Sequence, residues 1–101
     1  MFSIIWESET SYKLKVVTNQ HNEFLMQADN QFMLLSELSN CSYDVFASSD
    51  MDQLTLELHL LKNKLTDNES ILHVSEIIEL AMQCKSRPGS RLIFTPFKIM
   101  K

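Results

Sequence analysis

The stretch TDNESILHVSEIIELAMQCK, residues 66–85, decides the fold of this chain. Apolar side chains recur in it every three or four residues: Ile71, Val74, Ile77, Ile78, Ala81 and Cys84. This is the spacing of one helix face. Thr66 with Glu69 has the form of a capping box at its start, and Pro88-Gly89 ends the element. The stretch therefore predicts a helix whose apolar face needs another layer to cover it.

A second apolar stretch, residues 51–65, precedes this helix and is open to two interpretations. As a strand, it alternates polar side chains with Leu54, Leu56, Leu58 and Leu60. As a helix, it carries a single stripe formed by Met51, Leu54, Leu58, Leu61 and Leu65. We favour the helix because Ser49 and Asp52 have capping-box spacing, and because acids in the first turn and lysines in the last complement the helix dipole.

Short β-type runs lie on both sides of these helices. Five runs have the composition or alternation of strands: residues 2–6, 12–18, 23–28, 43–47 and 92–95. The first two predict a β-hairpin. In the second, Tyr12, Leu14 and Val16 alternate with their neighbours at the period of a half-buried strand.

Residues 31–38 favour a short helix. Asp29 or Asn30 is a suitable cap, and Phe32, Leu35 and Leu38 continue a helical spacing from Ala28. A hairpin turn at 29–30 followed by a strand at 32–35 remains open. Together these elements predict an α+β fold in a single compact domain, residues 1–101. Its antiparallel sheet is built from the N-terminal hairpin, further strands and the C-terminal strand, and two or three helices cover it.

Charge is distributed unevenly along the chain. The formal net charge is −4, but residues 1–60 hold nine acids against two bases, whereas residues 61–101 hold seven bases against four acids. An acidic surface repels nucleic-acid phosphates and attracts basic proteins. We therefore expect a protein partner and no nucleic acid.

Patterns of catalytic, cofactor-binding or metal-binding residues are missing. The histidines and cysteines lack the short spacings of zinc ligands, although a site built from His59, His73 and Cys84 is geometrically conceivable. Cys41, Asp44 and His59 have the residue types of nucleophilic catalysis without a supporting motif. A single glycine rules out a glycine-rich phosphate loop. We expect no enzyme activity, no cofactor and no metal.

Cysteine usage and hydropathy indicate the compartment. Two distant cysteines, Cys41 and Cys84, are fewer than the roughly four to eight of a disulfide framework, so we expect reduced thiols. Apolar runs fall short of the roughly 20 residues that span a bilayer. The acidic start, residues 1–9, is unlike a secretory signal. These features predict a cytoplasmic protein without membrane contact.

The order of elements resembles a known class of proteins. A hairpin, a strand, helices and a final strand ending in Leu92-Ile93-Phe94-Thr95-Pro96-Phe97 are similar to small acidic immunity proteins of bacterial polymorphic-toxin and contact-dependent growth inhibition systems. Residues 58–65 and 67–85 carry much of this resemblance. It implies a non-enzymatic inhibitor that binds and neutralises one cognate toxin domain, often a nuclease. The alternative is a small regulatory or self-associating module, so monomer and homodimer both remain open.

The expected partner-binding residues lie in the stretch without lysine or arginine, between residues 16 and 61. They gather around one loop and the start of one helix: Tyr43, Asp44, Asp50, Asp52 and Glu57. The loop is polar and therefore expected to be exposed, and loops often carry recognition. Tyr43 or Phe46 is the candidate aromatic anchor, with core packing expected for at least one of them.

Overall fold

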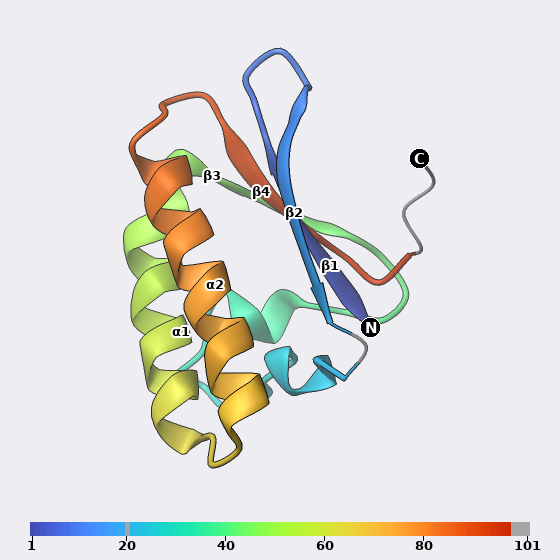
Figure 1. Cartoon of the computed structure of the whole chain (residues 1–101), viewed down its shortest axis with the longest axis vertical. Coiled ribbons are helices and arrows are strands. Elements are labelled where there is room, and N and C mark those ends of the chain that lie inside the picture. The colour runs from blue at the N-terminus through green and yellow to red at the C-terminus, as the bar shows by residue number, and fades with distance from the viewer. Residues whose placement is uncertain (20, 98–101) are drawn as a thin grey trace.

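Among the described residues, two α-helices cover one face of a four-stranded antiparallel sheet (Figure 1). The structure is a computed structural model that describes residues 1–19 and 21–97. Residue 20 and residues 98–101 lie outside the described residues. The elements are β1 (Phe2–Glu7), β2 (Lys13–Asn19), β3 (Asp44–Ala47), α1 (Met51–Lys64), α2 (Asn68–Lys85) and β4 (Arg91–Thr95). The strand order β2-β1-β4-β3 pairs the first and last strands at the centre.

The predicted α+β fold is confirmed. The N-terminal hairpin, the strand near residue 45, the final strand and the long second helix are all formed. In the contested stretch the helix prevails, because the buried side chains of α1 lie on one helical face: Met51, Leu54, Glu57, Leu58 and Leu61. Packing against α2 and the sheet selects that face over the alternating one.

Strand β2 turns its alternating apolar residues away from the helices. Val17 pairs with Ile4 on the helix-covered side and is 5% exposed, whereas Leu14 and Val16 are 38% and 40% exposed. The alternation correctly indicates a strand, but its apolar set faces the uncovered side of the sheet. Because β2 is an edge strand, β1 shields it on one side only.

The third strand predicted at residues 23–28 is wrong. A single 3-10 turn, η1 (Glu23–Leu25), stands there and buries Leu25. Both edges of β1 already pair with β2 and β4, so no edge of β1 is left for it. Instead the Asn22 side chain accepts a hydrogen bond from the Phe2 N–H at 2.6 Å and donates one to the Phe2 carbonyl at 2.8 Å.

The helix predicted over residues 31–38 shrinks to one 3-10 turn, η2 (Leu35–Glu37). Phe32, Leu35 and Leu38 are buried as their spacing predicts, while Ala28 is exposed. The segment does not continue as a helix because a side chain from α1 satisfies its backbone N–H groups, as described for Glu57 below.

Both helix starts differ by a residue or more from the predicted capping boxes. Before α1 stands a 3-10 turn, η3 (Ser48–Asp50), where the Asp50 carboxylate accepts the Ala47 N–H at 2.9 Å. At α2 the cap is Asp67, whose carboxylate accepts the Ser70 N–H at 2.9 Å. Asp67 has the extended backbone of a cap, φ −91° and ψ 138°, so Thr66 lies outside the helix.

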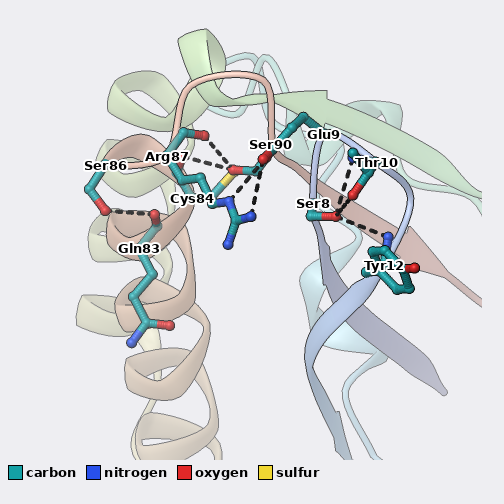
Figure 2. Close-up of polar contacts among 9 residues, drawn as sticks. All are labelled: Ser8, Glu9, Thr10, Tyr12, Gln83, Cys84, Ser86, Arg87 and Ser90. Carbon is teal, nitrogen blue, oxygen red and sulfur yellow. Dashed lines mark hydrogen bonds and ion pairs between the residues drawn. The ribbon is translucent and has the colours of Figure 1, made fainter.

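The connection from α2 to β4 is tied to the β1–β2 hairpin (Figure 2). The Arg87 guanidinium donates to both carboxylate oxygens of Glu9, at 3.0 and 3.1 Å. Gly89 has a φ of +90°, and a Cβ there would stand 3.1 Å from the Glu9 Cβ. The buried Ser90 hydroxyl donates to the Cys84 carbonyl. These contacts hold the end of α2 against the sheet.

Candidate protein-binding surface

The predicted binding residues do not form one acidic surface. Tyr43 precedes β3 and is 61% exposed, and Asp44, the first residue of β3, is half-buried. Asp50 is half-buried just before α1, while Asp52 is exposed in its first turn. Glu57 is fully buried. The structure therefore distributes them over the edge of the sheet, the start of α1 and the core.

The expectation that Glu57 contributes to an exposed surface is wrong. Its carboxylate accepts the N–H groups of Leu34 and Leu35, each at 2.9 Å, and the Gln53 amide at 2.7 Å. A buried carboxylate needs such donors because burying it without them is costly. Its position one residue before Leu58, on the apolar stripe of α1, is the sequence signal of this burial.

Asp44 faces the covered side of the sheet, across from Phe94. Within the described part of the chain its Oδ2 is buried without a hydrogen-bond partner, and burial raises the pKa of this carboxyl. Phe46 is 3% exposed and packs edge-to-face on Phe94, with ring centroids 5.5 Å apart. Phe46 therefore belongs to the core, and Tyr43 is the exposed aromatic of the two.

A groove lies on the outer side of the helix pair, with Asp52 in its wall. It measures about 550 Å³ and is lined by Asp52, Thr55, Leu56, His59, Met82, Lys85 and Ser86. Leu56 and Met82 are 55% and 60% exposed. The Asp52 carboxylate is 2.6 Å from the Lys85 ammonium. Sequence reasoning missed this site, although Leu56 and Met82 stand off the buried stripes of their helices.

A second groove lies on the face of the sheet opposite the helices. It measures about 430 Å³ and is lined by Ile5, Glu7, Tyr43, Val45, Arg91, Ile93 and Thr95. Both helices lie on the other side of the sheet (Figure 1). Val45 is 47% exposed at the β3 edge, and Glu7 and Arg91 form an ion pair. Tyr43 thus stands beside an apolar sheet surface, away from Asp52.

His73 belongs to a buried polar cluster and is not placed as a metal ligand. Its Nε2 lies 3.0 Å from the Asn22 Nδ2, and the Phe24 ring meets it edge-on. Desolvation lowers the pKa of His73, against a smaller opposing effect of Glu76. His59 instead lines the outer groove, and Cys84 is buried beside Ser90.

The thiols and the possible metal ligands complete the description of the reactive side chains. Cys41 is exposed and Cys84 buried, and both are free thiols. Among residues 1–19 and 21–97, no three His, Cys, Asp or Glu side chains gather as a metal ion requires. None of the helices described is long and apolar enough to cross a bilayer.

Comparisons with protein-family models, curated proteins and solved structures found no match to this chain.

Proposed function

We propose that this protein is a non-enzymatic inhibitor that binds and neutralises a basic protein, most simply a cognate toxin domain in the cytoplasm. The observation that carries the proposal is the outer groove between α1 and α2, where two large apolar side chains stand exposed beside Asp52. Exposed apolar side chains beside charged groups are typical of interaction surfaces.

The groove defines the chemistry of the partner. Leu56 and Met82 offer an apolar floor for one inserted side chain, which is how interface hot spots are commonly built. Methionine adapts its shape to a partner more readily than branched residues do. The formal net charge of −4 supplies long-range attraction for basic groups. The expected contact is an apolar side chain flanked by lysine or arginine.

The ion pair at the groove opens at little cost. Asp52 and Lys85 have side chains 79% and 58% exposed, and such surface pairs contribute only about 0–1 kcal/mol. A basic group of the partner replaces Lys85 on Asp52 without leaving a buried charge. Asp50 is less available, because its carboxylate already accepts the Ala47 N–H.

The test uses the product of the neighbouring reading frame, since immunity genes usually stand beside their toxin genes. Binding kinetics are measured at low and high salt with Leu56→Arg, Asp52→Asn and the wild-type chain. Leu56→Arg is expected to weaken binding at least tenfold, which corresponds to about 1.4 kcal/mol or more. Asp52→Asn is expected to slow association at low salt only.

The matched control is Leu72→Arg, a change at a 64% exposed leucine of α2 that does not line the groove. It adds the same charge and is expected to bind as the wild type does. Absence of binding to the neighbouring product, or equal binding by all variants, contradicts the proposal. Survival of cells that express the toxin together with each variant gives an independent readout.

A further inference from the structure

The outer groove follows the axes of the two helices that form its walls. Its lining residues on α1 stand three, four and seven positions after Asp52, and those on α2 and its C-cap stand three and four positions after Met82. These are the spacings of one helix face. From Asp52 to His59 the helix rises about 10 Å, which is about two turns of α1. The groove therefore runs along the helix pair and has the length of a short helical contact.

Both walls of this groove are open in the single chain. Leu56 on α1 and Met82 on α2 are 55% and 60% exposed, and the side chain of Asp52 at the end of the groove is 79% exposed. A small-molecule site encloses most of its ligand. Walls this exposed instead leave one side of an occupant in the solvent, so the groove suits a segment with one apolar face and one polar face.

Carbonyl groups in the last turn of α2, beside the groove, already accept hydrogen bonds from the chain itself. The Ser86 N–H donates to the Met82 carbonyl at 3.1 Å, and its hydroxyl donates to the Gln83 carbonyl at 2.8 Å. The Cys84 carbonyl accepts the Ser90 hydroxyl at 3.1 Å (Figure 2). The rest of both walls is helix, whose backbone groups bond to one another. An extended segment in this groove would therefore bury N–H and C=O groups of its own without partners, whereas a helix satisfies its own backbone.

We propose that the partner inserts an amphipathic helix into the outer groove, where it lies alongside α1 and α2 as a third helix. Its apolar anchor sits between Leu56 and Met82. Asp52 stands one turn before Leu56 on α1, so a lysine or arginine three or four positions from the apolar anchor reaches the Asp52 carboxylate. This inference rests on the proposed function, because it names the structural element with which the basic partner binds.

The test uses three synthetic peptides of about 20 residues, a length at which an alanine-rich chain forms a helix in water. The first carries leucine and arginine four positions apart on one helix face. The second has the same composition with its leucines and arginines on opposite faces, and the third is the first with a proline at its centre, which breaks the helix. Amide chemical shifts of the full chain are followed by NMR as each peptide is added.

The first peptide is expected to bind with a dissociation constant of about 1 mM or lower and to shift the amides of Leu56 and Met82. The second and third peptides are expected to bind at least about tenfold more weakly. Leu56→Arg is expected to weaken binding of the first peptide at least about tenfold, whereas the matched control Leu72→Arg leaves it unchanged. Asp52→Asn is expected to reduce the preference for the first peptide over the second, because that preference comes from the arginine beside the anchor.

A proline peptide that binds as tightly as the helical one overturns the proposal in favour of an extended segment. A helical peptide that shifts no amide, or only amides outside the groove, overturns it as well. The proposed function survives either result if the product of the neighbouring reading frame still binds and Leu56→Arg weakens that binding. If the helical peptide binds in the groove and the neighbouring product does not bind, the proposed function fails and the groove remains a site for helices.

Discussion

Helix α2 and the segment from residue 21 to residue 43 both bury apolar side chains, but they satisfy their backbones differently. α2 buries Val74 and Ile77, and its backbone hydrogen bonds are local because they join residues four positions apart in the same helix. The segment buries Leu25 and Phe32 with only short 3-10 turns. Side chains that are distant in sequence supply part of its hydrogen bonds. A local pattern therefore reports the structure of α2 and misreports that of the segment.

The largest effect is expected in α2, where the helix face meets the sheet. Ile77→Asp places a carboxylate at a fully buried position without a partner. The cost is expected to be several kcal/mol, about the whole stability margin of a small domain. Circular dichroism and thermal melting check this. A soluble variant that still melts cooperatively would show that Ile77 does not lie in the core.

The second prediction destabilises the segment of residues 21–43 by changing one side chain that is distant in sequence. Glu57→Gln removes the charge and places an amide NH2 group against groups that are themselves hydrogen-bond donors. We therefore expect the free energy of unfolding to fall by about 2–4 kcal/mol. Hydrogen exchange is expected to accelerate first at the amides of Leu34 and Leu35. The exposed Glu79→Gln is the matched control. Equal stability of the two variants would remove Glu57 as the anchor of the segment.

The third prediction concerns pH and the cluster that ties the segment to α2. The pKa of His73 is lowered in the folded chain, so the unfolded chain binds more protons once the pH falls below about 6.5. Stability is therefore expected to be level above that pH and to decline as the pH falls toward the lowered pKa. The free energy of unfolding is measured by urea titration between about pH 7.5 and about pH 5.5, a range that lies above the pKa of most carboxyl groups.

His73→Gln is expected to flatten this decline, whereas His59→Gln, the matched control at an exposed position, is expected to preserve it. A slope that survives in His73→Gln would assign the pH dependence to another group.

Asn22→Ala is expected to destabilise the fold at every pH, by about 1–3 kcal/mol, because it leaves the Phe2 N–H and carbonyl without their partner.

The smallest effect separates two neighbouring residues at the start of α2. Asp67→Ala removes the cap that accepts the Ser70 N–H and is expected to cost about 1 kcal/mol. Thr66→Ala changes the residue that the capping box predicts, and we expect it to stay within about 0.5 kcal/mol of the wild type. Urea titration of both resolves the difference. A larger loss of stability in Thr66→Ala than in Asp67→Ala would show that Thr66 is the helix cap.

The site was less predictable than the fold. Asp52 and Tyr43 are exposed as the sequence indicates, but they stand on different surfaces. Leu56 and Met82 were not identified, because a position off the buried stripe indicates only that a side chain is exposed, and the two residues line one groove only where α1 lies beside α2. The second groove, on the sheet, likewise exists only through register, which no single strand contains.

The amino-acid sequence by itself determined the elements whose hydrogen bonds are local or whose pattern repeats, which are α2, the hairpin and β4, while for α1 it favoured a helix that packing then selected over a strand. Tertiary structure alone decided the path of residues 21–43, the burial of Glu57 and the side of the sheet on which Val16 lies. The physical reason is that a backbone N–H group donates its hydrogen bond to whichever acceptor folding brings close to it. For Leu34 and Leu35 that partner lies more than 20 residues away.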